Sequence, residues 1–436
     1  MDGHNRIRFE MKGDGPPSVP PAENKGTPMM LVGAVVGGLS AYAFHALGGR
    51  GLGADAYAPI GVMWTIAFIT MAVVYVPMEQ WVTREKTQGL NPLAGGRRLL
   101  VTVVLVAMAL AALAAGLTLP SVTGKVGVHV IQMLVLVGGY GLFRVGMGML
   151  EGMGRFGRVG WMLCAEGILR LSAAGLVLIS GGGAVGLGWA MAAAPWVAFL
   201  FAFRRGNRSD APSVAGAVFV QQYVAGSLAA HILVAAAPLV VAYQGATPAQ
   251  VSVTFIVFVL FRAPVTLMYS LQGRILPPLV RMFTRGEEEP LRKLGSRLLA
   301  WSAGLAVLAA LFGFLLGPQV VRLLMSSVFV PSALVAALVA SGTTMAAGVQ
   351  LIGQILVAKS RTGRLATAWV VGLSAAALGV WLSPHGPVLS VAIGFWVGEV
   401  VALALVGSMS MSRRSRPRLA GSSSGDGPIA DAEPDG

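Results

Sequence analysis

The chain has a single cysteine, Cys164, among its 436 residues. One thiol cannot form an intrachain disulfide, and it cannot build a thiolate metal site by itself. Cys164 lies inside a long apolar run, where we expect a small residue of the packed interior. The sequence therefore predicts neither a disulfide framework nor a metal centre.

Signatures of common enzymes are also missing. The chain contains no GxxxxGK motif followed by serine or threonine, no HExxH, and no cluster of cysteine and histidine. We therefore expect no catalytic residues and no cofactor. Without a nucleotide site, any transport by this chain must be driven by a gradient, by supply and removal of the substrate, or by a partner.

Charge is scarce as well. Charged residues make up 11% of the chain, hydrophobic residues make up 55%, and the mean hydropathy is +0.74. This balance excludes a soluble protein of this length and predicts an all-α polytopic membrane protein. A transmembrane β-barrel would instead show alternating strands of about ten residues. Apolar runs of about 20 residues, the length of a membrane-crossing helix, predict twelve spans. We place them at 29–47, 58–82, 98–119, 127–149, 160–180, 186–203, 223–243, 251–272, 298–317, 332–357, 365–382 and 388–410.

The net charge of +14 does not indicate a nucleic-acid partner, because the basic residues lie in short loops between spans. Most lysines and arginines fall on one side of the predicted membrane, and the other side holds only Arg50, Lys125 and Arg322. Basic loops face the cytoplasm. The sequence thus predicts both termini in the cytoplasm of a bacterial cell, with 1–28 and 411–436 as disordered tails.

A charged segment, 204–222, divides the predicted spans into an N-lobe at 29–203 and a C-lobe at 223–410. Arg155 and Arg158 form an Arg-x-Gly-Arg pattern after the fourth span, and Arg361 and Arg364 repeat it after the tenth. Matched positions of this kind indicate a duplication into two parallel six-helix repeats. Two such lobes would enclose a central cavity.

Arg262 is the most informative charge, because it lies in the middle of the predicted span 251–272. An arginine at bilayer depth costs about 3 kcal/mol on insertion scales, so it is normally paired or faces a wet cavity. Pro264 follows closely and should kink the helix. We interpret this helix as a wall of a transport pathway, with Arg262 as a contact for an anionic group, since the guanidinium fork binds two phosphate oxygens at once.

Further polar residues within spans have two interpretations each. Glu79, near the end of the second span, could reach water or contact a substrate. His231 could titrate during transport or be a hydrogen-bonded neutral histidine.

Four more charges could form a coupling site or a structural network. Arg144 and Glu166 lie at matched depths, which predicts an ion pair, and Arg170 is one turn from Glu166 and can share its carboxylate. Glu399, midway along the last span, could be a protonatable coupling site or pair with another helix.

Three stretches carry a resemblance to a known family. They are LGADAYAPIGVMWTIAFITMAVVYVPMEQWVTRE (Leu52–Glu85), LEGMGRFGRVGWMLCAEGILRL (Leu150–Leu171) and FRAPVTLMYSLQGRILPPLVRMFTRGEEEPLRKL (Phe261–Leu294). Together they resemble the second helix, the fourth loop with the fifth helix, and the eighth helix with its basic loop in polysaccharide-type flippases. These flippases belong to the multidrug/oligosaccharidyl-lipid/polysaccharide (MOP) exporter superfamily.

The resemblance implies an alternating-access flippase that moves undecaprenyl-pyrophosphate-linked sugars or their relatives between leaflets. In that family, spans one, two, seven and eight line the cavity, which would place His45, Glu79, His231 and Arg262 there. The expected partners are an anionic lipid-linked glycan, membrane lipids and polysaccharide-assembly proteins. Cavities of the lipid II type are richer in arginine than this one, a departure that weighs against the peptidoglycan precursor as substrate.

Other functions remain open at this point. One is a drug antiporter of the same superfamily that uses Glu399 or Glu79 with a proton or sodium ion, although the first span has no carboxylate. Another is a major-facilitator transporter, whose characteristic loop is missing after the second span. The last is a membrane scaffold that recruits partners through its tails.

Overall fold

The computed structural model of the protein describes residues 26–202, 211–212 and 227–412. Within these ranges, nine helices are long and apolar enough to cross a membrane. The chain is therefore a multi-pass membrane protein with an almost entirely helical fold. Most of the two expected tails and of the linker 204–222 lies outside the described residues, and the count of twelve spans stays a prediction.

The first two predicted spans form one helical run, Thr27–Thr87, of 61 residues. It comprises α1 (Thr27–Thr70), a π-helical segment η2 (Met71–Tyr75) and α2 (Val76–Thr87). The run turns back at Gly53, whose φ of 76° is a conformation that glycine adopts without strain. His45 and Trp64, on either side of this turn, have ring centroids 4.3 Å apart, whereas a straight helix would separate them by about 28 Å.

The rest of the first helical group follows with short connections. It consists of α3 (Pro92–Gly95), α4 (Arg97–Thr118), α5 (Val126–Gly152), α6 (Phe156–Ile179), α7 (Gly183–Ala193) and α8 (Ala198–Ala202), with 3-10 turns η3 (Leu119–Ser121) and η4 (Ala194–Val197). Helices α1 and α6 cross closely at two glycines. A side chain on Gly33 would collide with the backbone of Gly160, and one on Gly160 would collide with the backbone of Met29.

One short element was not expected. The strand β2 (Ala211–Pro212), inside the predicted linker, pairs in parallel with β1 (Leu90–Asn91) in the loop after α2. The linker thus returns to the first helical group.

The second helical group begins with helical residues 227–235. It continues through α10 (Ala237–Tyr243), α11 (Pro248–Phe261), α12 (Ala263–Thr284), α13 (Glu288–Leu324), η5 (Ser327–Phe329), α14 (Ala333–Ala358), α15 (Thr362–Leu382) and α16 (Pro387–Met411). The kink expected from Pro264 in the predicted span 251–272 is confirmed, and it takes the form of a break at Arg262 between two helices. Pro264 has no N–H to donate, and its ring would clash with the carbonyl four residues earlier in a continuous helix.

The predicted repeat has a matching backbone geometry. Gly154 and Ser360 both have positive φ, 69° and 55°. The next residue in each copy donates its backbone N–H over 2.8 Å, Arg155 to the carbonyl of Leu150 and Arg361 to that of Leu356. Each Arg-x-Gly-Arg pattern therefore ends one helix in the same left-handed cap and starts the next one.

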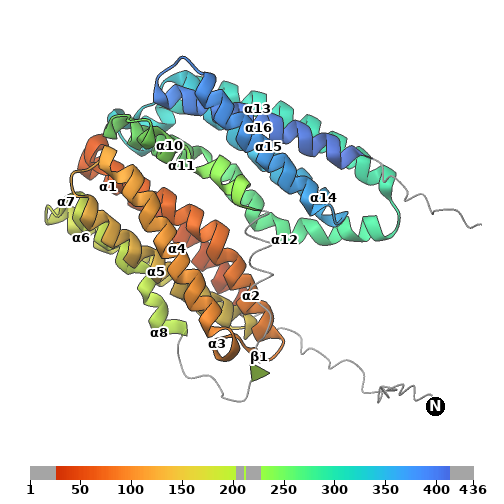
Figure 1. Ribbon diagram of the computed structural model, residues 1–436, viewed down its shortest axis with the longest axis horizontal. Helices are drawn as coiled ribbons and strands as arrows, with labels where there is room; N and C mark the ends of the chain where they lie inside the picture. Colours follow the sequence, from red (N-terminus) through yellow and green to blue (C-terminus); the bar gives the residue numbers. More distant parts are fainter. Residues whose placement is uncertain (1–25, 203–210, 213–226, 413–436) are drawn as a thin grey trace, which may run out of the picture.

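The two helical groups meet at one end and diverge at the other (Figure 1). Helix α1 contacts α10 and α11 across this meeting end. At the opposite end, α2 and α3 of the first group and the lower part of α12 lie apart (Figure 1).

Candidate functional site

Three sets of polar contacts join the helical groups at their meeting end. Arg50 donates from Nε and Nη2 to the carbonyls of Met325 and Leu323, at 2.5 and 2.6 Å. Asp55 accepts a 3.1 Å hydrogen bond from the backbone N–H of Ala249, in the first turn of α11. A carboxylate at a helix N-terminus is favoured by the helix dipole.

Ser252 completes these contacts by donating to the carbonyl of Ala54 at 2.6 Å, and its side chain is fully buried. We call this set of contacts the polar seam. It closes one end of the boundary between the two groups.

An aromatic layer adjoins the polar seam. His45 Nδ1 lies 2.6 Å from the hydroxyl of Tyr57, and the His45 ring packs edge-on against Trp64 and against Phe255 of the second group. Tyr57 in turn contacts Phe329. His45 is only 1% exposed, so in this conformation it is enclosed at the boundary and does not face an open cavity.

Arg262 lies where α11 ends and α12 begins. Its guanidinium carbon is 3.7 Å from the ring centroid of Phe68, in α1 of the other group. A cation over an aromatic face contributes about 0.5–2 kcal/mol, more when water is excluded. One turn earlier, Tyr42 of α1 reaches the carbonyl of Val259 at 3.5 Å. Ala263 and Pro264, the first residues of α12, are exposed, whereas the preceding helix α11 packs against α1. Arg262 therefore lies at the edge of the closed boundary.

His231 lies in the helical stretch 227–235 of the second group and is 9% exposed. Its Nδ1 is 2.8 Å from the carbonyl of Ser227, one turn earlier. A carbonyl oxygen only accepts, so Nδ1 carries the proton and donates it to Ser227. A role of His231 in transport stays a prediction.

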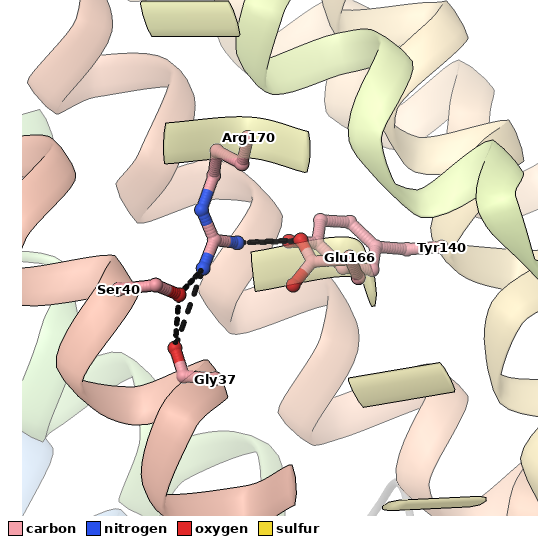
Figure 2. A network of polar contacts seen from close by, with 5 residues as sticks. All are labelled: Gly37, Ser40, Tyr140, Glu166 and Arg170. Atoms are coloured by element: carbon pink, nitrogen blue, oxygen red, sulfur yellow. Dashed lines mark hydrogen bonds and ion pairs between the residues drawn. The ribbon is translucent and has the colours of Figure 1, made fainter. Parts of the chain in front are cut away.

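A buried network fills the centre of the first helical group (Figure 2). Arg170 donates to Glu166 at 2.5 Å, to the Tyr140 hydroxyl at 3.3 Å and to the Ser40 hydroxyl at 3.1 Å. The Arg170 side chain is 3% exposed and its guanidinium lies 5.2 Å from the Trp64 ring centroid. The expected contact between Arg170 and Glu166 is confirmed, although no second arginine shares the carboxylate. Trp64 connects this network to the aromatic layer.

Arg144 does not pair with Glu166, so that prediction is wrong. Its Nη1 lies 2.7 Å from the carboxylate of Glu79, on α2. Helix α5 packs its Arg144 side towards α2, whereas Glu166 is already occupied by Arg170 and Tyr140. Glu79, expected in the cavity, is thus held inside the first group. Glu151, hydrogen-bonded to Thr83, lies close by.

Glu399 is fully buried on α16, and neither carboxylate oxygen has a hydrogen-bond partner within the described part of the chain. A buried polar group without a partner is costly unless it is neutral or changes partners. The proposed pairing with another helix, including Arg170, is not present. Nor does any group of three or more His, Cys, Asp or Glu side chains suited to a metal occur in the described ranges.

Sequence reasoning missed Arg50, Asp55, Ser252 and Phe68. Nothing local to these residues shows that they meet the other helical group. The one available signal was Thr247, which begins a capping box and so predicts the N-terminus of α11, the helix end that Asp55 contacts.

The sequence matches no protein-family model and no curated protein. Solved structures do resemble it. An inward-facing multidrug resistance MATE family transporter of the MOP superfamily matches with a TM-score of 0.65 and 14% identity, over 87% of this chain and 97% of that one. An outward-facing structure with the same description gives 0.53 and 15%, over 89% and 94%.

The lipid II flippase MurJ, in an inward closed conformation, matches with a TM-score of 0.61 and 9% identity, over 89% of this chain and 87% of that one. These likenesses define the class of fold: the chain has the architecture found in MOP superfamily transporters. At sequence identities this low, the similarities show the fold alone.

Proposed function

We propose that this protein is an alternating-access transporter that moves an anionic lipid-linked oligosaccharide, or a related polysaccharide-pathway intermediate, across the bacterial cytoplasmic membrane. The observation that carries the proposal is Arg262. It lies at a helix break, at the end of the closed boundary, and contacts Phe68 of the opposite helical group. A guanidinium so placed can exchange its aromatic contact for a pyrophosphate.

Alternating access requires two arrangements of the helical groups around one site. The polar seam and the aromatic layer close one end, and the groups diverge at the other (Figure 1). The higher similarity to an inward-facing transporter than to an outward-facing one supports a state open to the cytoplasm. Arg50, which the charge distribution places on the side away from the cytoplasm, lies at the closed end. The diverging end is therefore the predicted cytoplasmic side.

The substrate pathway in this proposal starts at the diverging end and leads to Arg262. Opening the polar seam and separating Arg262 from Phe68 would expose the same arginine to the other side of the membrane. The lipid tail of the substrate would remain in the bilayer while its charged head passes between the helical groups.

A proton- or sodium-coupled multidrug antiporter is the second candidate, and Glu399 favours it. A buried carboxylate without a partner is suited to bind and release a cation during a cycle. The same residue could couple a gradient to flipping, so it does not by itself select the substrate.

The test is export of the surface glycan by cells that carry Arg262→Ala or Arg262→Lys. We expect Arg262→Ala to abolish export at an unchanged protein level, and Arg262→Lys to retain part of it, because lysine keeps the charge without the bidentate fork. Arg285→Ala is a matched control, since that side chain is 71% exposed in a loop. Normal export by Arg262→Ala would contradict the proposal, and extrusion of cationic drugs without any effect on glycan export would favour the antiporter.

A further inference from the structure

A cluster of three cations lies where α14 ends and α15 begins. Lys359 donates to the carbonyl of Ser410 at 2.8 Å. Arg361 and Arg364 each donate from Nη1 to the hydroxyl of Ser412, both at 3.0 Å. We call Lys359, Arg361 and Arg364 the basic cluster. It converges on Ser410, in the last turn of α16, and on Ser412, just after the helix.

The contacts with the end of α16 leave most hydrogen-bond donors of the basic cluster available. An arginine has five N–H donors, and Arg361 and Arg364 each use a single nitrogen in these contacts. Within the described ranges, no carboxylate oxygen lies within 4.0 Å of any of the three cations. Burial, followed by the charge of Arg361, lowers the pKa of Lys359, whereas the charge of Glu288 acts in the opposite direction. One nearby carboxylate does not balance three cations. The cluster therefore holds excess positive charge that an anion would stabilise.

A shallow cavity of about 330 Å³, open to the surface, adjoins Arg364. Lys359 and Arg361 line a separate and much smaller pocket, together with Phe283 and Glu288. The lining residues of the larger cavity come from the start of α15 and the end of α16, namely Arg364, Thr367, Ser408, Met409 and Ser412. The volume lies at the lower end of the range of small-molecule sites. It is sufficient for a phosphate with its polar substituent, and its walls combine a cation, hydroxyl groups and an apolar side chain.

The surface beside the cavity is apolar and faces outward. From Thr367, the same side of α15 continues at helical spacing to Val371 and Leu378, which are 41% and 52% exposed. A free phosphate ion gains nothing from such a surface. A lipid whose headgroup occupies the cavity can lay an acyl chain along it.

We infer that the basic cluster and the adjoining cavity bind the headgroup of an anionic phospholipid. The lipid belongs to the cytoplasmic leaflet, because the basic loops are predicted to lie on that side of the membrane. Basic pockets between transmembrane helices are suited to such headgroups. Arg364, which lines the cavity, would bind the phosphate oxygens. Arg361, which shares the Ser412 hydroxyl with Arg364, would reach them from beside the cavity, and Lys359 would contribute charge. The inference is independent of the transported substrate, because the site lies within the second helical group, away from Arg262.

The test uses the purified full-length protein in detergent. Phosphatidylglycerol is titrated while the unfolding temperature is recorded, and phosphatidylcholine and inorganic phosphate are titrated in parallel. We expect phosphatidylglycerol alone to raise the unfolding temperature. The double variant Arg361→Gln/Arg364→Gln should weaken the apparent affinity by about 25-fold, since each cation near anionic lipid contributes about a factor of five.

Two further variants separate binding from folding. Arg361→Lys/Arg364→Lys keeps the charge and should retain most of the selectivity for phosphatidylglycerol. Arg155→Gln/Arg158→Gln alters the equivalent positions in the first helical group and should leave the affinity unchanged. Equal stabilisation by phosphatidylcholine would overturn the inference. So would an equal loss in the Arg155/Arg158 control, or stabilisation by inorganic phosphate that matches the lipid's.

Discussion

Removing the Arg50 side chain should open the polar seam. The residue makes two charge-assisted hydrogen bonds to carbonyls of the opposite helical group, at 2.5 and 2.6 Å. Such bonds contribute about 1.5–3 kcal/mol each when shielded, but Arg50 is exposed, so we assign about 1–2 kcal/mol to the pair. Arg50→Ala should then raise the population open at this end by about 5- to 30-fold.

The assay is thiol labelling of intact cells from outside. Ser252→Cys places a reporter on the polar seam at a fully buried position, in a Cys164→Ala background that removes the native thiol. The labelling rate by a membrane-impermeant maleimide measures the open population, because the reporter is accessible only when the groups separate. We expect the rate to rise in the Arg50→Ala background by the factor worked out above.

The control is Arg322→Ala, which removes an exposed arginine from the last turn of α13 at the same end of the molecule. It should leave the labelling rate unchanged. An unchanged rate in the Arg50→Ala background would refute the role of the polar seam, and an equal rise in both variants would show a general effect of surface charge. Labelling only from the cytoplasmic side would reverse the predicted orientation.

Three further predictions concern the interior of the helical groups. Gly33→Ala places a Cβ 2.3 Å from a carbonyl oxygen of α6, so we expect a loss of about 1–3 kcal/mol and a lower unfolding temperature in detergent; Gly38→Ala, with no atom within 4 Å, should melt like the parent. Arg170→Met leaves the Glu166 carboxylate buried without its cation and should lower the free energy of unfolding by about 3–5 kcal/mol. Adding Glu166→Gln should recover most of that loss, and failure to recover it in the same melting assay would refute the pairwise account. Glu399→Gln should fold normally and remove the dependence of transport on a proton gradient in proteoliposomes, and an unchanged dependence would exclude Glu399 from coupling.

Local patterns predicted much of the fold. The apolar runs correspond closely to α4, α5, α6, α14, α15 and α16, because the bilayer thickness sets the length of a crossing helix. The contact between Arg170 and Glu166 was also predictable, since residues four apart on a helix are neighbours whatever the helix packs against. The helix break beside Pro264 was predictable from local sequence as well, because the missing N–H is a property of proline itself.

The errors arise where two helices must be oriented relative to each other. Matched depth made Arg144 and Glu166 an acceptable pair, but depth does not tell which way a helix is rotated. The packing of α5 against α2 turned Arg144 to Glu79 instead. His45 was expected in an open cavity, and the closed boundary encloses it between Tyr57, Trp64 and Phe255.

The sequence by itself determined the helical membrane class, the one-sided distribution of basic loops that predicts orientation, and the matching Arg-x-Gly-Arg turns that predict a repeat. Each of these depends on segment length, local charge or backbone caps. Only the tertiary structure decided which charges meet. It brought Arg50 and Asp55 to the second helical group, Arg262 to Phe68, and the basic cluster to the end of α16. These contacts depend on the relative rotation and tilt of helices far apart in the chain, which interhelical packing sets and no local pattern records.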